Sequence, residues 1–498
     1  MKKLVYLIFA IVPLAAAITV LQSCGGQGGP TAPTGGGTTP VSEAFKALLP
    51  AAQQFATVTY VGSDACATCH NDPSNPHFDQ WKETAHYANN VTCERCHGPG
   101  STHVAAPGTH DSQADMATAN ILTMPNVASP TVCAQCHTET YAQYKESKHF
   151  EIVASPAKNT GTSRCQECHS AITRVMSYDA VPPVDFDNLT AAQHTMINNQ
   201  GYPDLATVPH TAACVTCHNP HSVTGNLNAD GEERQLRHAT ANTTDSAMLI
   251  NPLPIVFQQV NQLCGQCHQA RGADSTDTGL RAKTTSPNVH DAPQFNMLLG
   301  VTGAEGAATP VARTMAHTAA PGQCSHCHMG GGDHTWSATK FETGCAPCHD
   351  IAGAAARWPS TRDDVMNRLL ALKQRMSRWA QSQTWGGNPG GVDAWMYSNS
   401  IPAGQNKPTN QTDTYVPIEI KRARHNYYFI IRDGSYGVHN HTYVSFLLDE
   451  AEIEMDNAGF PKAMVSPTTR SLSSQDKLAI FKADLALVRM ADKLELGR

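Results

Sequence analysis

The stretch CSHCHMGGGDHTWSATKFETGCAPCHD, residues 324–350, contains one five-residue pattern twice. Each copy reads Cys-x-x-Cys-His, and the copies enclose an Asp-His pair, Asp333 and His334. The pattern occurs six more times upstream, always with His directly after the second cysteine. We number the eight copies as motifs 1 to 8 in chain order. Their cysteine pairs are Cys66/Cys69, Cys93/Cys96, Cys133/Cys136, Cys165/Cys168, Cys214/Cys217, Cys264/Cys267, Cys324/Cys327 and Cys345/Cys348.

This pattern is the attachment signature of c-type haem. Two thiols one short turn apart can form thioethers to one porphyrin, and the adjacent imidazole then reaches the iron. Zinc knuckles and disulfides are the alternatives, but zinc draws four ligands from two pairs and needs no His after each pair. A disulfide scaffold of this size would not space its cysteines so uniformly. We therefore expect eight covalently bound haem c groups, with proximal iron ligands His70, His97, His137, His169, His218, His268, His328 and His349.

The remaining cysteine, Cys24, follows a Met-Lys-Lys start and an apolar run from Leu4 to Val20. The run is short and flanked as in a signal peptide rather than a membrane span. Cys24 stands where a bacterial lipoprotein is cleaved and acylated, and Gly25 after it resembles lipoproteins of the outer membrane. An ordinary secretory signal with an incidental cysteine is the alternative.

Composition restricts what can fill the interior and what can bind. Only 6% of the 498 residues are aromatic and 15% are charged, so the haems are expected to supply much of the core. Removal of residues 1–23 would remove Lys2 and Lys3 and no acid, which takes the formal net charge from −7 to −9. Haem propionates would add negative charge, which makes nucleic acid an unfavourable partner.

The expected fold is mainly α with much irregular loop and very little β, wrapped around eight haems and followed by long C-terminal helices. Four segments, 361–379, 416–432, 442–458 and 474–496, carry apolar residues at helical spacing, with Thr361 and Ser474 as expected N-caps. The expected parts are a signal peptide over 1–23, a lipidated cysteine and flexible linker over 24–43, an octahaem domain over 44–350 and a haem-free helical region over 351–498.

The local sequences around the motifs resemble octahaem hydroxylamine oxidoreductase, its tetrahaem electron acceptor, and the pentahaem ammonia-forming nitrite reductases. The resemblance lies in CATCHNDPSNPHFDQWKETAH at 66–86, CERCHGPG at 93–100, VCAQCHTETYAQYKES at 132–147, CVTCHNPHS at 214–222, the stretch 324–350, and RARHNYYFIIRDGSYGVHNHTY at 422–443. It implies distal iron ligands among the 16 histidines outside the motifs: His86, His103 or His110, His149, His221, His317, His334 and His439.

These ligands would complete seven irons and leave the iron of motif 4, held by Cys165, Cys168 and His169, with an open face. The resemblance implies that an open fourth haem is the catalytic site of a nitrogen-oxide oxidoreductase. His77, His194, His210, His238, His290, His425 and His441 stay unassigned, and one near motif 4 could close the site. His326, inside motif 7, is expected to be a bystander.

The polar residues that such enzymes use beside an open iron are missing from the expected positions. His169 stands where the nitrite reductases have Lys, and Gln269, Ala270 and Arg271 stand where they have Tyr. Asp274 lacks the neighbouring His of hydroxylamine oxidoreductase, and 303–316 contains no His. A haem-crosslinking Tyr would be Tyr427, Tyr428 or Tyr443, although packing explains each of them; Arg164 and Arg271 could line an anion pocket or pair with propionates.

We therefore expect electron transfer by an exported, lipid-anchored octahaem cytochrome, with other redox proteins or periplasmic and extracellular acceptors as partners. A nitrite or hydroxylamine reductase with motif 4 as its site is the alternative. A haem wire assembled from many subunits through the C-terminal helices is a third interpretation, and the same helices could form a homo-oligomer.

Overall fold

The computed structural model describes residues 47, 59–71, 76–105, 121–122, 126–151, 166–169, 171, 174–175, 212–228, 231–237, 263–270, 273–287, 289–306, 310, 312–320, 322–338, 341–346, 348–461 and 472–496. Across these residues it is mainly helical, with long loops and one antiparallel pair of two-residue strands, β1 (Thr384–Trp385) and β2 (Asn388–Pro389). The expected fold class, mainly α with much irregular loop and very little β, is confirmed.

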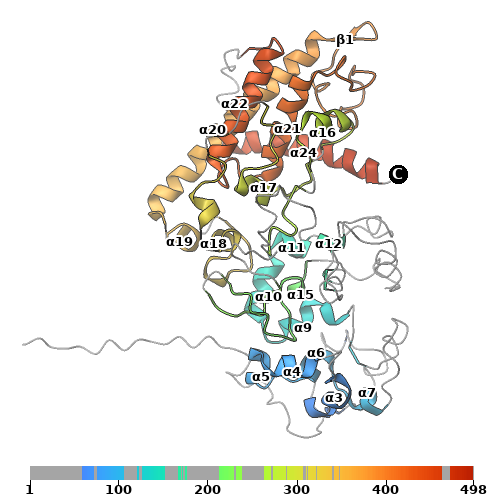
Figure 1. Ribbon diagram of the computed structural model, residues 1–498, viewed down its shortest axis with the longest axis vertical. Helices are drawn as coiled ribbons and strands as arrows, with labels where there is room; N and C mark the ends of the chain where they lie inside the picture. The colour runs from blue at the N-terminus through green and yellow to red at the C-terminus, as the bar shows by residue number, and fades with distance from the viewer. Residues whose placement is uncertain are drawn as a thin grey trace, which may run out of the picture.

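The part that carries the motifs consists of short helices joined by loops (Figure 1). The 3-10 turns within it are Asn126–Ala128, Ala316–Ala319 and Gly330–Gly332. The α-helices are α3 (Ser63–His70), α4 (His77–Lys82), α5 (Ala85–Ala88), α6 (Cys93–His97), α7 (Ser101–Ala105), α9 (Pro130–Ala134), α10 (Thr138–Lys145), α11 (Lys148–Glu151), α12 (Gln166–His169), α15 (Cys214–Cys217), α16 (Asp277–Ala282), α17 (Gln294–Leu299), α18 (Cys324–His328) and α19 (Phe341–Gly344).

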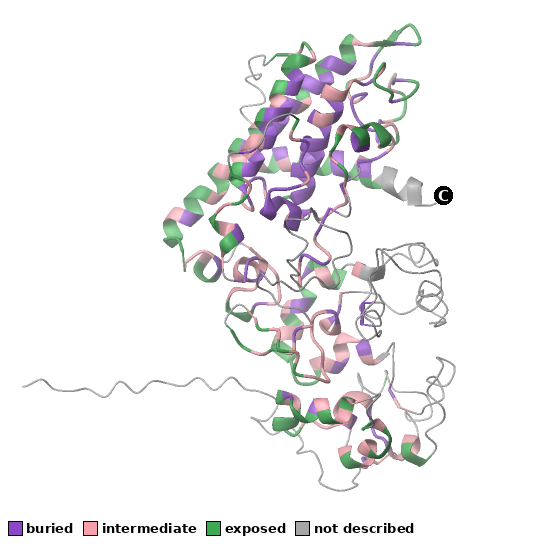
Figure 2. Ribbon diagram, viewed as in Figure 1, coloured by how far each residue is buried: buried purple, intermediate pink, exposed green. Residues whose placement is uncertain are grey.

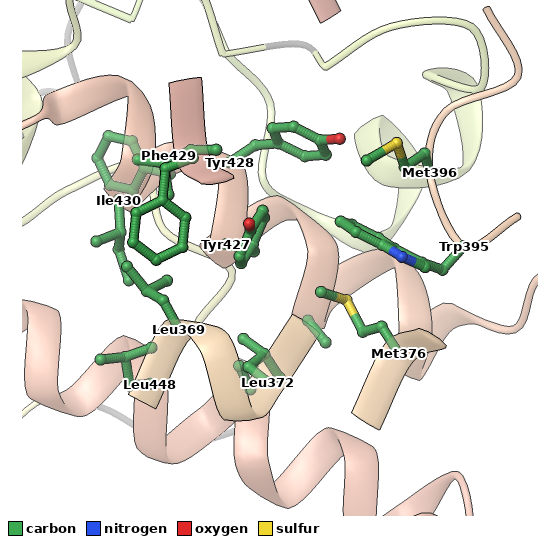
Figure 3. Packing of buried hydrophobic residues seen from close by; sticks show 14 of the residues in the cluster. Leu369, Leu372, Met376, Trp395, Met396, Tyr427, Tyr428, Phe429, Ile430 and Leu448 are labelled. Carbon is green, nitrogen blue, oxygen red and sulfur yellow. The ribbon is translucent and has the colours of Figure 1, made fainter. Parts of the chain in front are cut away.

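Four longer helices form a bundle at one end of the molecule (Figure 1). They are α20 (Ile351–Ser382), α21 (Ile418–Asp433), α22 (His441–Asn457) and α24 (Ser474–Leu496). Helix α21 is central and is buried over most of its length. Figure 3 shows its Tyr427, Phe429 and Ile430 packed with side chains of α20 and α22, among them Leu369 and Leu448.

The buried apolar side chains are concentrated in this bundle, whereas the motif-bearing part is mostly half-buried or exposed (Figure 2). The large apolar cluster draws chiefly on residues 365–488, while around motifs 2 and 3 the apolar cluster consists of Leu122 and Val132, with Cys96 and Val127 against it. Protein interiors are close-packed, so the sparse apolar packing of the motif-bearing part agrees with the expectation that haem forms part of its core.

Two expected N-caps are wrong. Helix α20 begins at Ile351 rather than near Thr361, because Asp350 accepts a hydrogen bond from the Gly353 N–H at 2.6 Å and the following alanines favour helix. The helix continues through Pro359. The last helix is capped by Ser473 instead of Ser474: Ser473 and Asp476 exchange backbone and side-chain hydrogen bonds at 3.2 Å in both directions, which is a capping box.

A buried polar contact ties three helices of the bundle together. The Asp484 carboxylate of α24 accepts hydrogen bonds from Lys373 Nζ of α20 at 2.6 and 2.7 Å and from the Tyr427 hydroxyl of α21 at 2.6 Å. Both Asp484 and Tyr427 are buried. Removal of one member of such a group leaves the others desolvated without a partner.

We expect Asp484→Ala to lower the free energy of unfolding of the bundle by about 3 kcal/mol, because it strands the Lys373 ammonium and the Tyr427 hydroxyl. Thermal unfolding followed by circular dichroism at 222 nm measures this. The matched control is Asp449→Ala: Asp449 also pairs with an arginine of α20, Arg368, at 2.6 Å, but its side chain is 63% exposed, so little change is expected. An equal loss of unfolding free energy in the two variants would show that the buried Asp484 contact does not stabilise the bundle.

Candidate haem ligand sites

Motifs 1, 2, 5 and 7 lie in the helices α3, α6, α15 and α18, and motifs 3, 6 and 8 form hydrogen-bonded turns. The His N–H donates to the carbonyl of the first cysteine, four residues earlier, at 2.9 Å in motif 3, 3.0 Å in motifs 5 and 6, and 2.8 Å in motif 8. Residues three and four apart lie on the same face of a helix. The turn therefore directs both thiols and the imidazole to one side, as attachment of a single porphyrin requires.

The structure brings each of six motif histidines close to a histidine outside the motifs, so that the two imidazole rings form a pair. The distances between ring centroids fall between 6.0 and 6.3 Å. The pairs are His70 with His103, His97 with His221, His137 with His86, His268 with His149, His328 with His439, and His349 with His317.

This spacing fits one iron atom between two imidazoles. A metal lies about 2.0 Å from the ring nitrogen that binds it, and the ring centre lies roughly 1.1 Å beyond that nitrogen. Two rings on opposite sides of one iron would therefore have centroids about 6.2 Å apart. The six observed pairs match this value, and each of them joins a motif histidine to a histidine outside the motifs.

The remaining expected distal ligand, His334, lies near motif 5. Burial chiefly lowers the pKa of His218 in motif 5 to about 4, and the charge of His334 contributes to the lowering. Burial also lowers the pKa of His149 to about 4 and that of His221 to about 3. These rings are neutral at pH 7, which is the form in which an imidazole nitrogen binds a metal.

Hydrogen bonds at Nδ1 fix the orientation of many of these rings and leave Nε2 for the iron. His97 pairs with the Leu122 carbonyl, His218 with the Arg234 carbonyl and His317 with the Val438 carbonyl, each at 2.8 Å. His328 contacts the Trp336 carbonyl at 3.0 Å, His334 the Gly332 carbonyl at 2.9 Å, and His268 the side-chain oxygen of Gln294 at 3.2 Å.

His439 has a stronger partner at the same position. Its Nδ1 lies 2.6 Å from a carboxylate oxygen of Asp433, which is fully buried. Burial lowers the pKa of His439, but the Asp433 carboxylate more than offsets this and the pKa is raised. A carboxylate that accepts a hydrogen bond from Nδ1–H makes the imidazole a more basic metal ligand. Asp433 was not predicted as a site residue, because a carboxylate six positions before a histidine is not a local motif.

Contacts between cysteines of different motifs show which motifs are neighbours. The side chains of Cys66 and Cys93 lie close enough to interact, as do those of Cys133 and Cys214, of Cys264 and Cys324, and of Cys168 and Cys267. Electrostatic interactions also join Cys96 to Cys136, Cys217 to Cys264, and Cys327 to Cys345.

Together these contacts give one line of motifs in the order 1, 2, 3, 5, 6, 7, 8. Motif 4 joins this line at motif 6 through Cys168. Figure 1 shows the same progression, from α3 and α6 at one end, through α9 and α15, to α18 and α19 beside the bundle. By its described residues, motif 4 therefore lies to the side of the line, next to motif 6, although it is fourth along the chain.

Only part of motif 4 lies in the described residues. Cys168 and His169 are described and half-buried, whereas Cys165 and the whole chain from 176 to 211 are outside them. The ligand on the other face of this iron therefore stays a prediction. Cys24 with the regions 1–23 and 24–43, as well as His110, Arg164, Arg271, His194, His210 and His238, also lies outside the described residues.

Several unassigned histidines have other contacts. His425 is buried in α21, and its Nε2 lies 2.9 Å from the Thr302 carbonyl. Its ring is therefore part of the packed core of the bundle. The Nδ1 of His290 lies 2.6 Å from the Asp291 carbonyl, His326 lies within α18, and His441 begins α22. His77 is different: its ring lies 4.9 Å from His221, beside the ligand pair of motif 2.

The three tyrosines considered for a haem crosslink are all buried in the bundle. The Tyr427 hydroxyl donates to Asp484, and the Tyr443 hydroxyl donates to Glu305 at 2.7 Å and accepts from the Gly303 N–H at 3.0 Å. Tyr428 packs against Trp395, with ring centroids 6.0 Å apart. Their contacts are those of packing residues.

Among the described residues, no helix is both long and apolar enough to cross a bilayer. In the same part of the chain, no cluster of three or more His, Cys, Asp or Glu side chains is arranged to hold a metal ion.

The angles between the paired rings predict distinct electron paramagnetic resonance (EPR) signals, because the g values of a low-spin bis-histidine haem depend on the angle between its ligand planes. The rings are near parallel at motifs 1 and 2, at 21° and 15°, and near perpendicular at motifs 3, 6 and 8, at 88°, 89° and 88°. We expect two rhombic signals and three with a large maximum g value in the oxidised protein. A spectrum with rhombic signals alone would contradict this geometry.

We also expect Asp433→Asn to raise the midpoint potential of one haem, that of motif 7, because a neutral amide makes His439 a weaker donor to ferric iron. Spectroelectrochemical titration measures the change. Asp449→Asn, an exposed carboxylate of α22, is the control and should leave every potential unchanged. An unchanged set of potentials in the Asp433 variant would show that the carboxylate does not act through His439.

Comparisons with known proteins give one structural relative and no family. No protein-family model matches the chain, and no curated protein is similar to it at a significant level. A solved structure, the undecahaem cytochrome from the S-layer of Carboxydothermus ferrireducens, is 20% identical with a TM-score of 0.45. The similarity covers 75% of this chain and 51% of that one, so this chain spans about half of that protein's length.

Proposed function

We propose that this chain is an exported, lipid-anchored octahaem c-type cytochrome that carries electrons along the line of motifs 1, 2, 3, 5, 6, 7 and 8. The observation that supports this best is the set of six ring pairs spaced 6.0–6.3 Å apart, each with one ring from a Cys-x-x-Cys-His motif. Haem, when bound, would supply the one-electron donor and acceptor at each position.

At the six motifs with paired rings, the protein side chains would hold the iron closed on both faces. An iron with two imidazole ligands has no free position for a substrate, so it is suited to exchange of electrons alone. Nδ1 hydrogen bonds to carbonyls keep the rings of His97, His218 and His317 in fixed orientations. Fixed ligands reduce the structural change that accompanies oxidation and reduction.

The ends of the line are accessible to partners. Cys69 in motif 1 and Cys348 in motif 8 are exposed, and so is Cys136 in motif 3. Electrons could enter at one terminal haem and leave at the other, to a redox protein or to an acceptor outside the cell. Acylation of Cys24 would place motif 1, the first motif after the linker, nearest to the membrane.

The branch position of motif 4 supports a second candidate function. The Cys168–Cys267 contact attaches motif 4 to motif 6, so electrons can pass along the line without passing through motif 4. A side position of this kind fits a site where a small nitrogen oxide or hydroxylamine would be reduced or oxidised. His169 is the residue that would hold that iron.

Haem content and spin state test both candidates. The full-length chain, matured with covalent haem, should gain the mass of eight haems, and the ferric protein should show low-spin signals for the seven motifs of the line. A low-spin eighth haem favours a pure carrier, and a high-spin eighth haem with nitrite or hydroxylamine turnover favours the enzyme. A chain that takes up no haem would overturn the proposal.

A matched pair of variants tests the line itself. We expect loss of haem 5, through Cys214→Ala and Cys217→Ala, to separate motifs 1–3 from motifs 6–8, whereas loss of haem 4, through Cys165→Ala and Cys168→Ala, should not. Voltammetry of protein attached to an electrode by its N-terminal end measures how many haems exchange electrons rapidly. Equal loss of rapid exchange in both variants would contradict the proposed order.

A further inference from the structure

Trp336 lies in the loop between motifs 7 and 8 and has an uncommon backbone conformation. Its φ angle is +53°, in the left-handed region that residues other than glycine seldom occupy. Such a residue costs roughly 1 kcal/mol or more and persists only where the surrounding contacts hold it. Among the described residues, Trp336 contacts three expected haem ligands, His149, His328 and His334.

The backbone carbonyl of Trp336 contacts the proximal histidine of motif 7. Its carbonyl accepts the hydrogen bond of His328 Nδ1 at 3.0 Å. His328 is the proximal histidine of motif 7 and faces His439. The left-handed conformation at Trp336 therefore decides where the acceptor for this ring lies.

The indole ring of Trp336 contacts the expected distal ligands of motifs 5 and 6. It meets the ring of His149 edge-on at 4.5 Å and 82°, and the ring of His334 at 5.4 Å and 78°. His149 faces His268 of motif 6, and His334 lies near His218 of motif 5. One aromatic side chain thus restricts the rotation of two distal ligands.

The loop around Trp336 is itself held in place. The buried Asp333 accepts hydrogen bonds from the backbone N–H and the hydroxyl of Thr335, at 2.9 and 2.7 Å. The His334 N–H donates to Gln143 of α10 at 3.0 Å. The ring of Tyr144, the next residue of α10, lies 6.4 Å from the indole. These contacts keep the indole at a fixed position between the two histidines.

We propose that Trp336 is a positioning residue for three consecutive haems, those of motifs 5, 6 and 7: its indole ring sets the ring planes of His149 and His334, and its carbonyl sets that of His328. This inference rests on the proposed bis-histidine cytochrome. The three haems include motif 6, where the branch to motif 4 joins the line. One residue would therefore tune the ligand geometry at the junction.

Three substitutions separate the two roles of Trp336. Trp336→Gly keeps the left-handed backbone, which glycine adopts without cost, but removes the ring, so we expect the EPR signals of haems 5 and 6 to shift while that of haem 7 stays. Trp336→Val disfavours the left-handed backbone, so the haem 7 signal should shift as well. Trp336→Phe keeps an aromatic ring and should restore the signals of haems 5 and 6 to near their wild-type positions.

Reference variants assign the signals. His334→Met, His149→Met and His439→Met should each remove one bis-histidine signal and so identify haems 5, 6 and 7. Trp358→Gly is the matched control: Trp358 is also half-buried, but its ring packs against Phe341 and Arg362, and haems 5 to 7 should be unaffected.

The inference is overturned if haems 5 and 6 keep their wild-type signals in Trp336→Gly. It is also overturned if the EPR signals of all eight haems shift together, because that would indicate a general loosening of the fold. A third contradicting outcome is a haem 7 signal that shifts no more in Trp336→Val than in Trp336→Gly. A wild-type protein without low-spin bis-histidine signals would instead contradict the proposed function. The two failures are therefore distinguishable.

Discussion

Paired imidazoles at a fixed separation are the constraint on which the motif-bearing part of this protein depends. Rings from different parts of the chain stay 6.0–6.3 Å apart without touching, and apolar packing around them is sparse. The hydrogen bonds at Nδ1 orient them from outside, and a bound haem would fill the space between them and complete the interior.

The C-terminal bundle has a conventional apolar core and contributes to the haem sites at one place. The loop between α21 and α22 presents His439 to His328 of motif 7, and the carbonyl of Val438 to His317, which faces motif 8. Asp433, the last residue of α21, holds His439. The rigid, fully buried helix thus fixes the ligands of the last two motifs, so the bundle and the motif-bearing part depend on each other.

The spatial order of the motifs differs from their order in the chain, and this difference shapes the function. Motif 3 lies beside motif 5, and motif 4 is displaced to the side of motif 6. The line could then conduct on its own, while the branch is free for a different role.

The sequence by itself determined the elements that depend on local spacing. The eight expected attachment sites follow from Cys-x-x-Cys-His, and the long helices at 416–432, 442–458 and 474–496 follow from their apolar period. The scarcity of aromatic side chains indicated that something else fills the interior. Local sequence was less reliable at helix ends: the Asp350 cap and the Ala-rich turn override the expected start at Thr361, and Ser473 caps the last helix in place of Ser474.

Only the tertiary structure decided which histidine faces which motif. His103 and His70 lie 33 residues apart in the chain, while His439 and His328 are 111 apart, and no local spacing relates such partners. The same holds for Asp433 behind His439 and for Trp336 between three ligand sets. Each of these contacts joins residues that are brought together by the folding of separate loops, and hydrogen-bond geometry in three dimensions, rather than residue order, selects them.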